Sequence, residues 1–284
     1  MMREVTLKNG ITLPAIGIGT WRLGEGLNPH VEEVAAVRTG IEAGLKLIDT
    51  AEMYGNGGSE KVVGEAIRTY DRGKLYLVSK VLPSNANRSR MAQACENTLR
   101  RMGTDYLDLY LYHWRGGTPL AETVACLEDL KEKGRIRAWG VSNFDLYDME
   151  ELFEVPNGKN CLVNQDLYHI DSRGIEFDLK PWMEEQHIVL MSYCPLAMGS
   201  RLSRGLLNNP VLRKIAEAHD ATVAQIILAW NIRNGQTIAI PKSVREKRVI
   251  ENAKAGEIVL TNEELSMIDA EFPAPTRKMP LDIQ

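Results

Sequence analysis

The sequence lacks the features that mark disulfide-rich, zinc-binding and membrane proteins. Only four of its 284 residues are cysteines, Cys95, Cys126, Cys161 and Cys194, each more than 30 positions from the next. No Cys-x-x-Cys pair supports a zinc ribbon or a thioredoxin-like site, and isolated thiols are typical of a reducing compartment. There is no stretch of 18 apolar residues, and the start, MMREVTLKNG, lacks the apolar run of a signal peptide. We therefore expect a cytoplasmic protein that does not bind membranes.

A strong charge of one sign is also lacking. Lys and Arg number 34 and Asp and Glu 38, which gives a formal net charge of -4. A dedicated nucleic-acid binder carries a basic footprint, so we expect no nucleic-acid partner, whereas a small anionic ligand needs only a local cluster. No Pro- or Ser-rich linker divides the chain. This favours a single domain over residues 1–284.

Eight short apolar runs recur along the chain. They lie at residues 16–20, 45–51, 75–80, 106–114, 138–143, 162–165, 188–196 and 237–242. Helix-length amphipathic segments separate them, and such runs are typical of buried parallel strands. Strands alternating with helices over roughly 250 residues predict an α/β fold, the (β/α)8 TIM barrel. A doubly wound sheet is the alternative, but Gly-x-Gly-x-x-Gly is missing because Thr20-Trp21-Arg22 follows Gly17-Ile-Gly19.

Shorter signals place elements around the barrel. Asn9-Gly10, flanked by alternating runs, predicts an N-terminal β-hairpin within residues 5–20. We predict helices at 31–44, at 59–70 with Ser59 as N-cap, at 120–133 with Gly134 as a stop, and after a capping box at 261–264. About 40 residues separate the last two runs, which predicts an extra helix or a ligand-covering loop.

Polar residues stand where the predicted strands end. In a barrel, functional residues gather at that rim. They are Asp49, Lys80, His113, Ser142, Asn143, Gln165, Tyr193 and Lys242, with Tyr54 shortly after Asp49. Each alone has a structural explanation, such as an ion pair between Asp49 and Lys80, but their joint occurrence favours a catalytic site.

Four of these residues suit proton donation to a carbonyl oxygen. A phenol is a poor acid at neutral pH, so we expect the Lys80 ammonium to lower the pKa of Tyr54. Asp49 would keep Lys80 charged and aimed, and His113 would hydrogen-bond the substrate carbonyl. The carbonyl carbon then requires a hydride.

A basic cluster follows the last predicted strand. Arg245, Lys247 and Arg248 surround Lys242-Ser243 in a chain of net negative charge. Positive charge and a hydroxyl suit a phosphate monoester, but a solvated start of a helix explains the same residues equally well. The residues alone leave both interpretations open.

Over essentially its full length the chain resembles the aldo-keto reductase superfamily. It is most similar to short-looped bacterial members that reduce small aldehydes and dicarbonyls, methylglyoxal reductases among them. The motifs that carry the resemblance are Gly19-Thr20-Trp21, LIDTAEMYGNGGSEKVVGEAI (47–67), LVSK (77–80), LDLYLYHW (107–114), WGVSNF (139–144), NQ (164–165) and IPKSVREKRVIENAK (240–254).

The resemblance implies an NADPH-dependent oxidoreductase that reduces aldehydes or ketones to alcohols and needs no metal. It makes Asp49, Tyr54, Lys80 and His113 a catalytic tetrad with Tyr54 as the proton donor. The residues that it assigns to NADP(H) are Gly19, Thr20, Trp21, Ser142, Asn143, Gln165, Tyr193, Leu196, Lys242, Ser243, Arg248, Glu251 and Asn252. Among these, Ser142, Asn143 and Gln165 would hold the nicotinamide amide, and Tyr193 would stack on its ring. Lys242, Ser243 and Arg248 would clamp the 2′-phosphate, and Gly199, Ser200 and Arg204 are further candidates for the pyrophosphate.

The resemblance also implies an open, permissive substrate pocket in a monomeric protein. Trp21, Tyr54, His113 and Trp114 would line the pocket, with Met53 and Tyr168 as further candidates. Arg115 follows Trp114 where relatives often have proline, which would favour polar or anionic substrates.

Two other functions remain to be weighed. One is a barrel aldolase in which Lys80 forms a Schiff base, and the other is a non-catalytic regulatory protein that binds NADP(H). The predicted phosphate clamp argues against the first, and the complete tetrad argues against the second.

Overall fold

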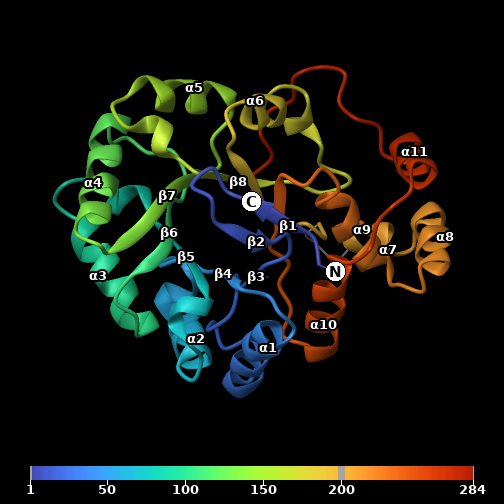
Figure 1. Cartoon of the computed structure of the whole chain (residues 1–284), viewed down its shortest axis with the longest axis horizontal. Coiled ribbons are helices and arrows are strands. Elements are labelled where there is room, and N and C mark those ends of the chain that lie inside the picture. The colour runs from blue at the N-terminus through green and yellow to red at the C-terminus, as the bar shows by residue number, and fades with distance from the viewer. Residues whose placement is uncertain (1, 198–201, 284) are drawn as a thin grey trace.

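In the part of the chain that the structure describes, eight parallel strands curl into a barrel (Figure 1). The structure is a computed structural model that describes residues 2–197 and 202–283, without the side chains of residues 202–204. The strands are β3 (Ile18–Gly19), β4 (Leu47–Asp49), β5 (Tyr76–Val81), β6 (Leu107–Tyr112), β7 (Ile136–Ser142), β8 (Val163–Leu167), β9 (Val189–Tyr193) and β10 (Thr237–Ala239). Each strand pairs with the next one along the chain. The predicted (β/α)8 architecture and all of the predicted strands are confirmed.

The barrel closes where its first and last strands meet. Gly17 N donates to Ala239 O at 2.8 Å, and Gly19 N donates to Pro241 O at 3.0 Å. A Cβ on Gly19 would lie 2.5 Å from Ile240 O, so this approach requires glycine. This seam, residues 17–19 against residues 239–241, leads directly into Thr20 on one side and Lys242 on the other.

Helices cover the outer face of the barrel, and side chains inside the barrel cover its inner face, so the strands are buried on both sides (Figure 1). They are α1 (His30–Glu42), α2 (Gly58–Ile67), α3 (Met91–Met102), α4 (Leu120–Glu132), α5 (Leu146–Glu154), α6 (Leu179–Glu185), α7 (Leu202–Leu207), α8 (Pro210–Ala218), α9 (Val223–Asn231), α10 (Glu246–Ala255) and α11 (Asn262–Glu271). Short 3₁₀ turns lie at Tyr54–Gly57, Arg72–Lys74, Pro83–Asn85, Gly158–Asn160 and Gly174–Glu176. The helices α7, α8 and α9 fill the long connection before β10, as the sequence predicted.

The predicted hairpin is present, with a longer loop than Asn9-Gly10 suggests. β1 (Glu4–Thr6) pairs antiparallel with β2 (Thr12–Pro14), and the last pair is Thr6 with Thr12, so residues 7–11 form the loop. Gly10 has φ +86°, and its N–H donates to Leu7 O at 2.8 Å. Because β2 leads into β3, the hairpin covers the end of the barrel where the strands begin.

The prediction of Ser59 as an N-cap is wrong, because α2 begins one residue earlier, at Gly58. The Ser59 hydroxyl is buried and takes part in a chain of hydroxyl groups instead. Thr50 Oγ1 donates to Ser59 Oγ at 2.9 Å, Ser59 Oγ donates to Thr20 Oγ1 at 2.7 Å, and Thr20 Oγ1 donates to Asp49 O at 2.8 Å. This chain joins the ends of β3 and β4, where the predicted site lies.

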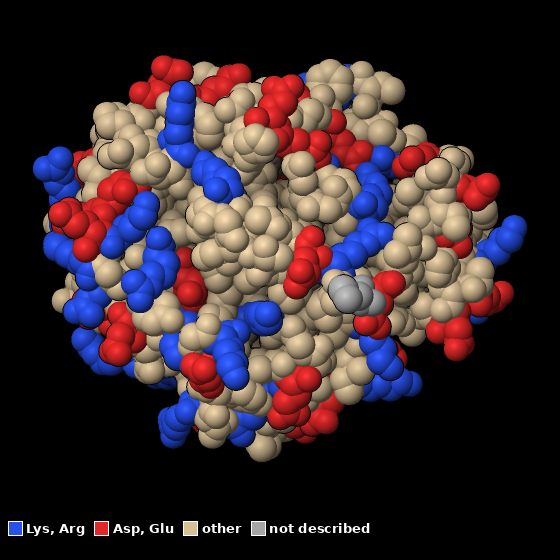
Figure 2. Space-filling view, viewed as in Figure 1, with Lys and Arg blue, Asp and Glu red and all other residues tan. Residues whose placement is uncertain are grey.

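Two other helix signals are confirmed. Gly134, with φ +71°, follows α4 as predicted, and Thr261 forms a capping box with Glu264 at the start of α11. On the surface, Lys and Arg side chains are interspersed with Asp and Glu over the face in view (Figure 2). Among the described helices, none combines the length and the apolar character needed to cross a membrane.

Candidate active site

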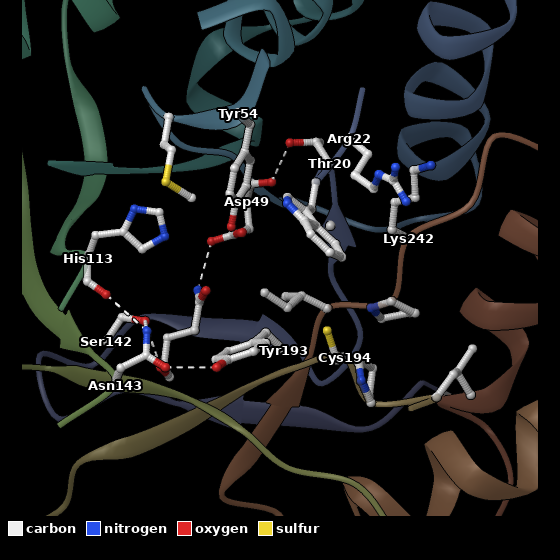
Figure 3. A pocket seen from close by; sticks show the side chains of 18 of the residues that line it. Thr20, Arg22, Asp49, Tyr54, His113, Ser142, Asn143, Tyr193, Cys194 and Lys242 are labelled. Atoms are coloured by element: carbon white, nitrogen blue, oxygen red, sulfur yellow. Dashed lines mark hydrogen bonds between the residues drawn. The ribbon is translucent and has the colours of Figure 1, made fainter. Parts of the chain in front are cut away.

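A pocket of about 400 Å³ opens at the end of the barrel where the strands finish (Figure 3). The predicted site residues that line it are Gly19, Thr20, Trp21, Asp49, Tyr54, His113, Ser142, Asn143, Gln165, Tyr193, Leu196 and Lys242. Met53 lines it as well. The lining residues that the sequence analysis missed are Arg22, Cys194, Pro195, Ala197, Ile240 and Pro241. These flank predicted residues in the chain, which is the signal that would have found them.

Lys80 lies beneath the pocket with its ammonium group fully hydrogen-bonded. Its Nζ donates to Asp49 Oδ2 at 2.7 Å, to Thr50 O at 2.9 Å and to the Tyr54 hydroxyl oxygen at 3.1 Å. The Lys80 side chain is fully buried. Three donors meet three acceptors, so the amine has no hydrogen left for another partner.

This geometry directs the hydroxyl proton of Tyr54 into the pocket. Because the phenol oxygen accepts from Lys80, its own O–H is directed away from the ammonium group and is available to an acceptor in the pocket. Burial raises the pKa of Tyr54 well above its usual value, and the charge of Asp49 acts in the same direction. The net shift is opposite to the one expected from Lys80, because burial and the charge of Asp49 outweigh the favourable contact between the ammonium group and the phenolate. Tyr54 therefore stays protonated at neutral pH.

The buried pair of Asp49 and Lys80 is tied to the opposite side of the barrel. Gln165 Nε2 donates to Asp49 Oδ1 at 2.8 Å, while Oδ2 receives Lys80. Burial raises the pKa of Asp49 and lowers that of Lys80, and the charge of each partner opposes both shifts. We interpret the contact as an ion pair because both charged groups have several hydrogen-bond partners.

His113 is neutral, and the burial of its Nδ1 determines which ring nitrogen carries the proton. Burial, together with the charge of Lys80, lowers the pKa of His113 to about 2. Its Nδ1 is buried and has no hydrogen-bond partner among the described residues. A proton on Nδ1 would be left unsatisfied, so the favoured tautomer carries it on Nε2, the other ring nitrogen. His113 is then a hydrogen-bond donor.

Asn143 connects three strand ends on the far side of the pocket. Its Nδ2 donates to His113 O at 3.0 Å, and its Oδ1 accepts from the Tyr193 hydroxyl at 2.8 Å (Figure 3). Ser142 Oγ donates to Gln165 O at 2.8 Å. Asn143 has φ +57°, a conformation that asparagine tolerates better than most residues. Ser142, Asn143, Gln165 and Tyr193 thus form one surface of amides, a hydroxyl and an aromatic ring.

Two cations lie at the other end of the pocket. Figure 3 shows Arg22 and Lys242 near one another, on the side away from His113. Lys242 is half-buried, and desolvation lowers its pKa while Glu33 opposes that shift. Arg22 lies 3.6 Å from Glu25 and over the ring of Trp21. Two positively charged side chains therefore lie at this end of the pocket.

The other predicted phosphate contacts lie beyond the pocket. Ser243 Oγ accepts from Arg245 N at 3.1 Å, which bends the chain into α10. Arg248 is exposed on α10, Glu251 pairs with Lys247 at 3.9 Å, and Asn252 is buried. These four predicted residues follow Lys242 in the chain but do not line the cavity itself. Gly199 and Ser200 lie outside the described residues, as does the side chain of Arg204.

The predicted substrate wall needs three corrections or refinements. Tyr168 does not line the pocket, because it is fully buried and stacks on Trp230 at a centroid distance of 5.4 Å. Trp114 is outside the lining set but stands beside it, with its ring 4.8 Å from that of His113. Arg115 does not offer a free charge to a substrate, because two of its nitrogens bind Glu151 at 3.0 and 2.9 Å.

The chain matches a known protein family over most of its length. The model of the aldo/keto reductase family matches residues 15–271. Methylglyoxal reductase YeaE of Escherichia coli (strain K12) is 51% identical over 281 residues, which cover 99% of each chain. Glyoxal reductase of Bacillus subtilis (strain 168) is 38% identical, over 94% of this chain and 91% of the relative. A crystal structure of an aldo/keto reductase from Klebsiella pneumoniae in complex with NADP and acetate has a TM-score of 0.97, 49% identity and full coverage of both chains.

The fold and the site define a barrel oxidoreductase that acts on carbonyl groups. The chain belongs to the aldo/keto reductase family, as predicted, and is an NADP-dependent aldo-keto reductase. The aldolase alternative is wrong. The geometry agrees, since the Lys80 amine is buried and fully engaged in hydrogen bonds.

Proposed function

We propose that this protein reduces small α-oxoaldehydes of the methylglyoxal type to hydroxycarbonyl compounds, with NADPH as the reductant and Tyr54 as the proton donor. The observation that carries the proposal is the Tyr54 hydroxyl, 3.1 Å from Lys80, with its O–H available to the pocket. The likeness to relatives named methylglyoxal reductase and glyoxal reductase supports this substrate class.

The residues present suit NADPH along the whole length of the pocket. Ser142, Asn143 and Gln165 offer donors and acceptors to the nicotinamide amide, and the Tyr193 ring offers a stacking surface. Lys242, with Ser243 and Arg248 beyond it, offers two positive charges and a hydroxyl to the 2′-phosphate. Arg22 adds a charge inside the pocket itself. The other predicted contacts, Gly19, Thr20, Trp21, Leu196, Glu251 and Asn252, complete our assignment.

When bound, NADPH supplies the hydride that reaches the carbonyl carbon. His113 donates from Nε2 to the carbonyl oxygen and fixes the direction of the substrate. Tyr54 gives its proton to the same oxygen as negative charge develops there. The phenolate that remains is stabilised by the Lys80 ammonium, which keeps its charge because Asp49 accepts from it. Tyr54 then regains its proton from water.

The walls of the pocket favour a small and uncharged substrate. Trp21 and Met53 line it with apolar surface, and Trp114 stands next to His113 at its mouth. Arg115 is bound to Glu151 and leaves no free positive charge at that edge. An α-oxoaldehyde is small, neutral and strongly electrophilic at its terminal carbon, which suits this combination.

We place the activity in a monomer of one domain, residues 1–284, in the cytoplasm. Isolated cysteines support the cytoplasm, the lack of a linker supports one domain, and the resemblance to short-looped bacterial members supports a monomer. In this proposal the partners are the cofactor and a small carbonyl substrate, without a metal ion or a nucleic acid.

The decisive experiment measures NADPH consumption with methylglyoxal, glyoxal, an aromatic aldehyde, an aldose and a cyclic ketone. We expect the highest kcat/KM with methylglyoxal or glyoxal and a lower value with NADH at the same concentration. Faster turnover of the aldose or the cyclic ketone would contradict the substrate class and leave the general chemistry intact. Binding of NADPH without oxidation by any carbonyl would support the regulatory alternative.

A further inference from the structure

The turn at residues 142–145 sets the position of the groups that we assign to nicotinamide. It carries Ser142 and Asn143, and the positive φ of Asn143 makes the backbone turn sharply there. In this conformation the Asn143 amide binds both His113 O and the Tyr193 hydroxyl. Anything that shifts the turn therefore moves the amide groups relative to His113.

Carboxyl groups crowd this turn. Asp145 caps α5 by accepting from Leu146 N at 2.8 Å, and Asp148 completes the capping box by accepting from Asp145 N at 3.2 Å. The side chain of Asp166 is fully buried, and the backbone N–H groups of Asn143 and Phe144 in the turn act to lower its pKa. Burial raises the pKa of Asp166 well above its usual value, and the charge of Asp145 adds to the shift. Three carboxyl groups therefore lie at this turn, and a nearby cation would offset the repulsion between them.

The C-terminal segment provides that charge. Beyond α11 the chain passes α6 and ends near the centre of the barrel in projection (Figure 1). Lys278 in this segment donates to Asp145 Oδ1 and, at 3.0 Å, to Asp178 Oδ1. Asp178 caps α6 by accepting from Leu179 N at 2.7 Å. One ammonium group therefore joins the caps of two consecutive helices.

The segment is anchored on both sides of Lys278. Arg173, in the loop before α6, binds the backbone oxygen of Phe272 and, at 2.7 Å, Asp269 Oδ1. Ser172 Oγ binds Asp282 at the far end. Fixed at both ends, the segment holds Lys278 over the two caps with little conformational freedom, which lowers the entropic cost of the ion pairs.

We infer that Lys278 is a positioning residue for cofactor binding, because it holds Asp145 and thereby the turn that presents Ser142 and Asn143. The inference rests on the proposed function, in which this turn binds nicotinamide. The C-terminal segment acts as a strap that the active-site turn requires, although Lys278 itself touches neither the pocket nor a ligand. The second cation near the turn is Arg115. It lies 4.0 Å from Asp148 but hydrogen-bonds to Glu151 at 2.9 Å, so its main partner is Glu151.

The test compares Lys278→Met with Lys278→Arg and with Arg277→Met, a change at the exposed neighbour in the same segment. We expect Lys278→Met to raise the Kd of NADPH about threefold to fivefold, the upper part of the range for a partly exposed charge pair. The same change should speed hydrogen exchange of the amides of residues 143–146. Lys278→Arg should restore both values to within about twofold, and Arg277→Met should change neither.

Asp145→Asn provides the matched partner. It removes the charge but keeps an oxygen for the cap, so Lys278→Met and Asp145→Asn should each weaken NADPH binding. The double variant should be no weaker than the worse single variant. Additive effects would overturn the inference, as would a lower Tm for Lys278→Met with unchanged Kd and exchange. A wild-type protein that binds NADPH but reduces no carbonyl would overturn the proposed function, whereas the Kd and exchange measurements would still decide the role of Lys278.

Discussion

Gln165 Nε2 donates to Asp49 Oδ1 at 2.8 Å, across the barrel from β8 to β4. Gln165 belongs to the group that we assign to the nicotinamide amide, and Asp49 holds the lysine next to the proton donor. Cofactor binding and proton donation therefore both depend on the carboxylate of Asp49. A change at either residue is expected to alter both cofactor binding and proton donation, so their effects should not be additive.

Replacement of the proton donor gives the first prediction. Tyr54→Phe removes the hydroxyl but keeps the ring that packs near His113. We expect kcat for carbonyl reduction to fall about 10²- to 10⁴-fold, the usual contribution of general acid catalysis. The Kd of NADPH, measured by fluorescence titration, should stay within about twofold, which corresponds to less than 0.5 kcal/mol. Tyr147→Phe, at an exposed tyrosine on α5, is the control, and a Tyr54→Phe enzyme with normal turnover would contradict the assignment.

The buried ion pair gives a prediction about stability. Lys80→Met leaves Asp49 buried with its charge uncompensated, which costs about 3–5 kcal/mol of unfolding free energy. Adding Asp49→Asn removes the stranded charge, so the double variant should recover part of the loss. Urea denaturation of the two single variants and the double variant measures the coupling. Equal losses in Lys80→Met and in the double variant would show that the charge on Asp49 is not what destabilises the first.

The lowered pKa of His113 gives a pH prediction. Unfolding restores the imidazole to its ordinary pKa near 6.5, whereas in the fold the pKa is about 2. Below about pH 6 the unfolded chain therefore binds a proton that the folded chain does not, so this residue makes the unfolding free energy fall as pH falls. The difference in unfolding free energy between His113→Gln and the wild type should shift in favour of the variant by about 1.4 kcal/mol for each pH unit as the pH falls from about 6 to 4. Parallel curves from urea denaturation would contradict a neutral, buried His113.

Cofactor preference should separate the two cationic positions. Arg248 lies on α10 beyond the pocket, where only a 2′-phosphate would reach it, whereas Arg22 lines the pocket itself. We expect Arg248→Ala to raise the Kd of NADPH about tenfold or more and to leave that of NADH nearly unchanged, as expected for the loss of a charge-assisted hydrogen bond. Arg22→Ala should weaken both cofactors by similar factors. Equal effects of Arg248→Ala on the two cofactors would rule out the phosphate clamp.

Alanine substitutions at two glycines in the loop after β3 should distinguish the cost of backbone strain from the cost of a packing clash. Gly24 and Gly26 have φ of +72° and +74°, but only Gly24 is closely packed. A Cβ on Gly24 would lie 2.3 Å from the backbone carbon of Gly58, and a Cβ on Gly26 would meet nothing within 4 Å. Gly26→Ala should cost about 1 kcal/mol, and Gly24→Ala should cost several times more and reduce turnover. Thermal unfolding and kcat of the two variants test this, and equal losses would contradict the packing explanation.

Much of the fold could be predicted because buried parallel strands leave a direct trace in the sequence. Runs such as LYLVSK begin with four consecutive apolar residues, since both faces of β5 are covered. Their polar ends then marked Asp49, Lys80 and His113. A capping box can likewise be predicted from the sequence, as at Thr261, because its donors and acceptors lie within one turn of helix.

The failures share a cause, which is that they depend on contacts between distant segments. Ser59 looked like a cap, but its hydroxyl bonds to Thr20, 39 positions away in the chain. Tyr168 looked like a pocket wall, and only the position of Trp230 shows that it lies in the core. The pKa of Tyr54 depends on how far burial and Asp49 outweigh Lys80, and a strand pattern contains neither quantity.

The seam between residues 17–19 and residues 239–241 has a consequence for the order of assembly. It pairs the strands that are farthest apart in the sequence, so loop entropy makes it the slowest contact of the sheet to form. Thr20 and Lys242 flank this seam, so they line one pocket only once the barrel has closed. A chain emerging from the ribosome therefore acquires its cofactor groove with its last strand, and a cofactor that spans the groove stabilises the shut barrel by mass action.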